Sequence, residues 1–145
     1  MIKKRNIGRN TLAQDLGHWL EFDVKSGLAN AFAFAEKNPY NDKDLFIDEV
    51  ILHIKTAGGT GSSVLDVDVT TSATGTGDTI FDGVDLNSTG VYSSRTPGDT
   101  GTNGNEKIKI WNKAGGTNDF LTGKILVANA SNLVGKVYVR VREVK

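Results

Sequence analysis

The stretch SVLDVDVT alternates apolar and acidic side chains, and this alternation limits the local structure of the chain more than any other feature. Leu65, Val67 and Val69 fall on one side of an extended backbone, and Asp66 and Asp68 fall on the other. A period of two is the repeat of a β-strand that buries one face and presents the other to solvent. Strands are predicted on the same grounds in the stretches HWLEFDV, NAFAFAEK, LFIDEVILHIK, GVYSS, KIKIWN, FLTGKILVANA and LVGKVYVRVREVK.

The number of these stretches predicts an all-β fold. About eight strands separated by turn segments favour an antiparallel β-sandwich or jelly roll. The chain has 17 glycines to supply the turns, and KSG is short enough to join HWLEFDV to NAFAFAEK as a hairpin. We expect one β-sandwich domain, residues 18–145, preceded by an extended basic N-terminal arm, residues 1–17.

The predicted arm is the most basic segment of a neutral chain. Lys3, Lys4, Arg5 and Arg9 stand against the single acid Asp15, whereas the whole chain has 17 basic and 17 acidic residues. A basic segment on a neutral body predicts contact with an acidic surface, and the four cations are the candidate contact residues. A solvated terminus without a partner remains the alternative interpretation.

Composition excludes several classes of partner and of stabilising bond. The chain has no cysteine, so it forms no disulfide and no cysteine-based metal cluster. No apolar stretch is long enough to cross a bilayer, and no apolar signal core follows MIKKRNIGRN. Lys107, Lys109, Trp111 and Lys113 form a small basic and aromatic run, but the neutral net charge argues against nucleic-acid binding. We therefore expect neither a nucleic acid nor a membrane as partner.

Side chains suited to catalysis are few. His18 and His53 are the two histidines, and no serine lies in a G-x-S-x-G pattern. Two histidines without cysteine provide few ligands for a metal ion. Asp66 and Asp68 place two carboxylates side by side, which suits glycoside hydrolysis but is also typical of any solvated strand face. We expect no enzyme activity, no catalytic or metal-binding residue and no cofactor.

The glycine-rich stretch TTSATGTGDTIFDG has three possible interpretations. A phosphate-binding loop would need a lysine and a following helix, and neither is present. Calcium-binding β-rolls depend on a repeated motif, and GTGD occurs once. We therefore expect a crossing between sheets, with Asp78 and Asp82 as turn residues and Ile80 and Phe81 as an apolar anchor. A structural calcium near Asp78, Asp82 and Asp85 stays open.

Exposed aromatic side chains on a β-sandwich are typical of carbohydrate-binding modules. Trp111 and Tyr92 are the candidates for such a platform, although aromatic residues in strands more often pack in a core or an interface. A carbohydrate-binding module is therefore one alternative function.

From Ile47 to Arg142 the chain resembles small structural proteins of tailed bacteriophages. The resemblance rests on the order of the segments IKTAGG, VLDVDVTTSAT, GDTIFDGVDLNSTGVYSS, GDTGTNG and LTGKILVANASNLVGKVYVRV. These proteins are capsid decoration (cement or auxiliary) proteins and head-fibre proteins. The resemblance does not cover residues 1–46.

The resemblance implies a non-enzymatic protein on the capsid exterior of a virion. It implies that a homotrimer binds the lattice of the major capsid protein and stabilises the head. Ile51, His53, Trp111 and Tyr138 are then candidates for the oligomer interface, although the sequence does not separate interface residues from core residues. Another virion β-protein, such as a head-fibre base or a tail component, is the second alternative function.

Overall fold

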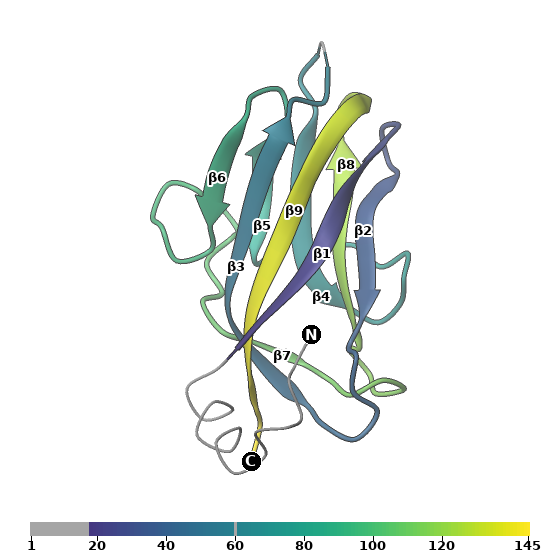
Figure 1. Cartoon of the computed structure of the whole chain (residues 1–145), viewed down its shortest axis with the longest axis vertical. Helices are drawn as coiled ribbons and strands as arrows, with labels where there is room; N and C mark the ends of the chain where they lie inside the picture. The colour runs from purple at the N-terminus through teal and green to yellow at the C-terminus, as the bar shows by residue number, and fades with distance from the viewer. Residues whose placement is uncertain (1–17, 60) are drawn as a thin grey trace.

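The protein folds into two β-sheets that pack face to face (Figure 1). The structure is a computed structural model that describes residues 18–59 and 61–145. The predicted arm, with Lys3, Lys4, Arg5 and Arg9, lies outside the described residues. Nine strands and no helix are found in the described part of the chain, which confirms the all-β prediction.

The strands follow one another along the chain with loops of varied length. They are β1 (His18–Gly27), β2 (Phe32–Lys37), β3 (Leu45–Thr56), β4 (Val64–Thr70), β5 (Phe81–Asp85), β6 (Gly90–Ser93), β7 (Lys109–Trp111), β8 (Phe120–Leu126) and β9 (Ala130–Glu143).

Strand order confirms the predicted sandwich and defines it as a jelly roll. One sheet, which we call the front sheet, has the order β1-β9-β3-β6, and the short β7 pairs with the other end of β3. The other, the back sheet, has the order β2-β8-β4-β5. All pairings are antiparallel, and most connections cross from one sheet to the other, as in a double-sheet jelly roll.

The core lies between the sheets and includes the positions of β4 that were predicted to share its buried side. Val50 of β3, Val139 of β9, Leu65 and Val67 of β4, and Leu121 of β8 are fully buried. Their neighbours in sequence point outward, because successive side chains of a strand face opposite ways. Local alternation therefore selected the buried face of β4 correctly.

The hairpin predicted for the first two strands is wrong. β1 pairs with β9 in the front sheet, and β2 pairs with β8 in the back sheet. The loop between them crosses the open side of the sandwich, where the Asn30 amide donates to the Ile125 carbonyl at 2.7 Å. A short loop permits a hairpin but does not require one, and here the two strands bury more by joining different sheets.

The stretch TTSATGTGDTIFDG contains one element that the alternation did not reveal. Ile80 and Phe81 are buried, which confirms them as an apolar anchor. Phe81 also begins strand β5, which pairs with β4 and completes the back sheet. The strand is short, and Gly83 interrupts it with a φ of 84°, so its sequence shows no clear period of two.

Candidate functional site

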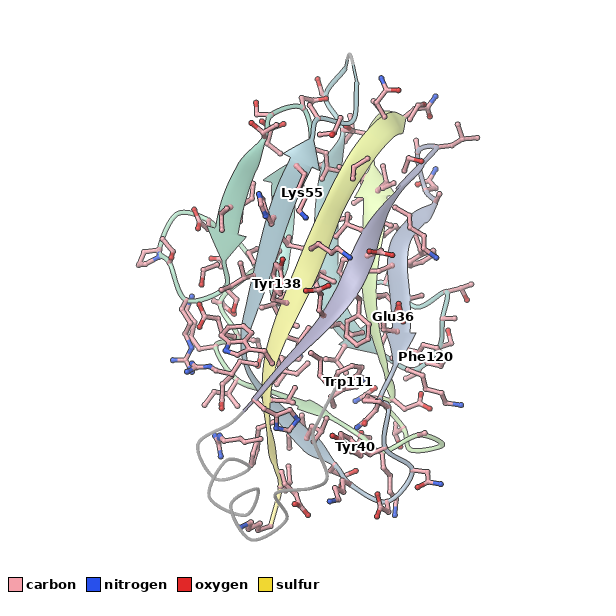
Figure 2. All side chains as sticks on the ribbon, viewed as in Figure 1. Glu36, Tyr40, Lys55, Trp111, Phe120 and Tyr138 are labelled. Atoms are coloured by element: carbon pink, nitrogen blue, oxygen red, sulfur yellow. The ribbon has the colours of Figure 1, made fainter. Side chains whose placement is uncertain are left out.

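Three of the four predicted interface residues meet on the outer face of the front sheet. Ile51 of β3 lies directly opposite Tyr138 of β9, and His53 lies opposite Lys136 in the next row. All are partly exposed in the single chain. Figure 2 shows Tyr138 on the sheet nearer the viewer. Val91 of β6, opposite His53, adds an aliphatic side chain that is 63 % exposed.

Two of the cations beside this centre are paired within the chain. The Nζ of Lys136 lies 2.6 Å from Asp23 and 3.3 Å from Glu21. The hydrogen bond to Asp23 is the main cause that raises the pKa of Lys136, and the same bond lowers the pKa of Asp23. Arg140 lies 3.6 Å from Glu49. Lys136 and Arg140, beside the apolar centre, are therefore compensated within the chain, whereas Lys55, two residues beyond His53 on β3, has no ion pair among the described residues.

Trp19 adds an aromatic side chain that was not singled out for this face. It is about half exposed, and the guanidinium of Arg140 stands 5.8 Å from the centre of its ring. Its position follows from the alternation in HWLEFDV, which directs Leu20 and Phe22 inward and Trp19 outward. We name the outer face of Trp19, Ile51, His53, Val91 and Tyr138 the front face.

Trp111 does not belong to this surface, which corrects its place among the interface candidates. Its side chain is fully buried, its Nε1 donates to the Asp119 carbonyl at 2.8 Å, and its ring meets Phe22 edge-on at 6.4 Å. Ile110 of β7 and Ile108, just before the strand, are exposed instead, because β7 covers the end of the core with Trp111. Trp111 therefore offers no exposed surface to a subunit or a glycan.

Tyr92, the other candidate for a glycan platform, also faces the core. It lies opposite Leu52 in the pairing of β6 with β3 and packs against the buried cluster. Burial raises the pKa of its hydroxyl, with smaller contributions from Asp85 and Asp99. Neither aromatic side chain on which the carbohydrate-binding alternative was based is a flat exposed platform.

Three aspartates converge beside the glycine-rich loop, but they are not the predicted three. Asp66, Asp78 and Asp82 each place one carboxylate oxygen within 4.8 Å of the others. Asp85 instead accepts a hydrogen bond from the amide of Asn87. Burial is the main cause that raises the pKa of Asp66, and the charges of Asp82 and Asp78 act in the same direction. Calcium takes six to eight oxygens, of which these carboxylates would supply a part.

The same carboxylates hold neighbouring loops together. The amide of Gly83 donates to Asp66 at 2.8 Å, and Asn103 donates from its amide to Asp82 and from its side chain to Asp78, each at 3.0 Å. These bonds join β4, the loop before β5 and the loop that contains Asn103. The aspartates thus bridge neighbouring segments. Asp78 lies in the loop before β5, whereas Asp82 lies within β5, which corrects its prediction as a turn residue.

Asp68 differs from the solvated residue that the alternation predicts. It shares the outward face of β4 with Asp66 but is 7 % exposed, because the following loop covers it. Its carboxylate accepts from the Thr79 hydroxyl at 2.8 Å and lies 3.3 Å from the Nζ of Lys109. Asp68 and Asp66 therefore each anchor the glycine-rich loop, which accounts for the paired carboxylates that had suggested glycoside hydrolysis.

No known protein family, no curated protein and no solved structure matches the chain. Among residues 18–59 and 61–145, no helix is long and apolar enough to cross a membrane.

Proposed function

We propose that the protein is a non-enzymatic structural component of a bacteriophage particle, bound as a homotrimer to the major capsid protein on the outside of the head. The proposal rests on the phage resemblance of residues 47–142, together with the front face. The jelly roll is the architecture that this resemblance implies. The observation that carries the oligomer is the apolar centre of the front face, where Ile51 lies opposite Tyr138 and the neighbouring Lys136 and Arg140 are each paired with an acid of the same chain.

A face of this kind suits contact with further copies of the chain. Around the three-fold axis of a trimer, the same side chains of all three copies come close together, which costs energy when they carry unpaired charges. Here Lys136 and Arg140 already have acidic partners in their own chain. Ile51, Tyr138 and Val91 then supply the apolar centre that an oligomer interface buries.

The oligomer is tested by the mass of the purified protein in solution. The expected value is three times the chain mass of 15.6 kDa at micromolar concentration. Ile51→Asp should reduce it to the chain mass, because a buried unpaired carboxylate opposes association. Ile108→Asp, which places the same charge on an exposed isoleucine outside the front face, should leave the mass unchanged. A monomeric wild-type protein would contradict the trimer.

The capsid contact is tested on particles that lack the protein. We expect the full chain to bind the particle at many equivalent lattice sites, where modest individual affinities combine. Deletion of residues 1–10, which removes Lys3, Lys4, Arg5 and Arg9, should weaken binding. Cryo-EM of the particle separates this function from the alternative, because a single ring at one vertex would indicate a head-fibre base or a tail component. Full binding by the truncated chain would exclude the arm as a contact.

A further inference from the structure

Leu28 and Val127 are the two most exposed large apolar side chains of the described residues. Leu28 is 64 % exposed in the loop between β1 and β2, and Val127 is 73 % exposed in the loop between β8 and β9. Both loops lie at the same end of the sandwich, at the upper right in Figure 1. We name this pair of loops, residues 28–31 and 127–129, the tip.

Hydrogen bonds fix the two loops to each other and to the back sheet. The amide of Ala29 donates to the side-chain oxygen of Asn129 at 2.9 Å. Asn30 donates to the Ile125 carbonyl at 2.7 Å, and Ile125 donates back to Ala31 at 2.8 Å. The two exposed side chains are therefore presented on a braced support. A partner that bound them would lose little affinity to ordering these loops.

The backbone of Val127 is in a conformation that valine disfavours. Its φ is 74°, in the left-handed region, where a β-branched side chain is a genuine outlier. Asn30, in the adjacent loop, has a φ of 72° and is of a residue type that tolerates it. Residues held in this region are concentrated at binding and catalytic sites. Because the Val127 side chain is 73 % exposed, it has apolar surface left to bury, and burial against a partner would offset the strain.

Basic side chains lie on the front sheet beside the tip. Lys25 and Lys55 line a shallow depression of about 390 Å³, and the half-exposed Val134 lies in its wall. Neither lysine side chain forms an ion pair or hydrogen bond with another described residue, although both charges lower the pKa of the nearby Asp23. The third lysine of the depression, Lys136, is already bound to Asp23. Two cations are thus available to an acidic partner.

We infer that the tip is a second docking site, which inserts Leu28 and Val127 into an apolar pocket of a protein partner whose rim is acidic and meets Lys25 and Lys55. The identity of that partner as the capsid protein rests on the proposed function. The tip and the start of β1 lie at opposite ends of a ten-residue strand, about 30 Å apart. Contacts at both ends would let one chain bridge neighbouring capsid subunits.

The experiment compares three variants in binding to particles that lack the protein. Val127→Asn and Leu28→Ser should each bind about tenfold more weakly than the wild type, as for an apolar anchor at an interface. Ile108→Ser, which removes an exposed isoleucine near β7 at the other end of the sandwich, should bind as the wild type does. Val127→Asn should also melt a few degrees higher, because asparagine tolerates the positive φ.

Each outcome decides between specific possibilities. If Val127→Asn loses binding but keeps its thermal stability, the tip is supported as a docking site. A valine with only a structural role would affect binding only by lowering stability as well. If Val127→Asn and Leu28→Ser bind the particle as well as the wild type does, the tip is not a docking site, while the proposed function stands. A wild type that does not bind overturns both. Sedimentation of the wild type, but not Val127→Asn, with phosphatidylcholine–phosphatidylserine vesicles would identify a membrane as the partner and overturn the protein pocket.

Discussion

The indole Nε1 of Trp111 donates a hydrogen bond of 2.8 Å to the backbone carbonyl oxygen of Asp119. The same carbonyl accepts from the amide of Asn38, so three segments meet at one oxygen: β7, the loop before β8 and the residue after β2. The side-chain amide of Asn38 in turn donates to the Trp111 carbonyl at 2.9 Å. This buried cluster closes the end of the sandwich where the chain passes from β7 in the front sheet to β8 in the back sheet.

Loss of the Trp111 side chain should open this end of the core. Trp111→Ala should lower the free energy of unfolding by about 3–5 kcal/mol, the usual cost of removing a large buried aromatic residue. Trp111→Phe should cost about 1–3 kcal/mol, because it loses the hydrogen bond and part of the volume while Asn38 still satisfies the Asp119 carbonyl. Urea unfolding followed by circular dichroism measures both. Equal stability of the phenylalanine variant and the wild type would contradict a closing role for the bond.

Loss of the Lys109 side chain should lower stability more than loss of the Lys136 side chain, although both lysines form ion pairs. The Nζ of Lys109 lies 3.3 Å from the buried Asp68 and donates to Thr79 at 3.0 Å. Lys109→Met should lower the free energy of unfolding by about 1–3 kcal/mol, because a buried carboxylate loses its cation. Lys136→Met is the control, since Asp23 is solvent-exposed and the midpoint of urea unfolding should hardly move. The reverse order of the two effects would contradict the assignment of Asp68 as a buried anchor.

The raised pKa of Asp66 predicts a pH dependence of stability. Burial, Asp82 and Asp78 raise this pKa above its ordinary value of 3.8, so the folded state binds a proton more readily than the unfolded state. The ionised carboxylate therefore costs stability at neutral pH, and the cost disappears as the pH falls below 3.8. Asp66→Asn, which keeps an oxygen acceptor for Gly83, should melt higher than the wild type at neutral pH, with a difference that vanishes in acid.

Thermal melts of both proteins across this pH range, with EDTA present, test the expectation. The same melts in calcium chloride serve as the comparison. A wild type that is stabilised by calcium while Asp66→Asn is not would mean that the three carboxylates bind the cation.

Gly101 should be intolerant of a side chain. Its φ is 74°, and a Cβ atom there would lie 1.9 Å from the carbonyl oxygen of Asp82. Gly101→Ala therefore combines backbone strain with a collision against a main-chain atom, and we expect a loss of about 2–4 kcal/mol. Gly98→Ala is the matched control, because its φ is 95° but a Cβ atom would meet nothing within 4 Å. It should cost about 1 kcal/mol. Chemical denaturation compares the two, and equal losses would refute the collision.

Alternation predicted the faces of strands well and their partners poorly. The buried face of β4 depends on local spacing alone, and Leu65 and Val67 are buried as expected. The pairing of β1 with β9 joins residues more than a hundred positions apart, such as His18 and Val141. No local pattern determines such a pairing, so the hairpin was a reasonable but wrong prediction.

For the candidate site, too, local patterns predicted single residues but not the contacts between strands. The sequence offered Ile51, His53 and Tyr138 as candidates without separating interface from core residues, and only the register brings Ile51 opposite Tyr138. Trp111 was misplaced because its burial depends on contacts that alternation does not encode, with the Asp119 carbonyl eight residues away and with the ring of Phe22, which is remote in sequence. The tip had no sequence signal, since a left-handed φ at Val127 is unexpected from its residue type.

The central position of β9 has a consequence for synthesis. Residues 130–143 form the strand that separates β1 from β3, and β8 similarly separates β2 from β4. A ribosome that has released only the first hundred residues has delivered neither middle strand, so β1 and β2 emerge with no partner strand to pair with. Such long-range pairing is slow to form. We expect the chain to fold after its last strand has left the ribosome, and chains cut short before residue 130 to be recovered as aggregates.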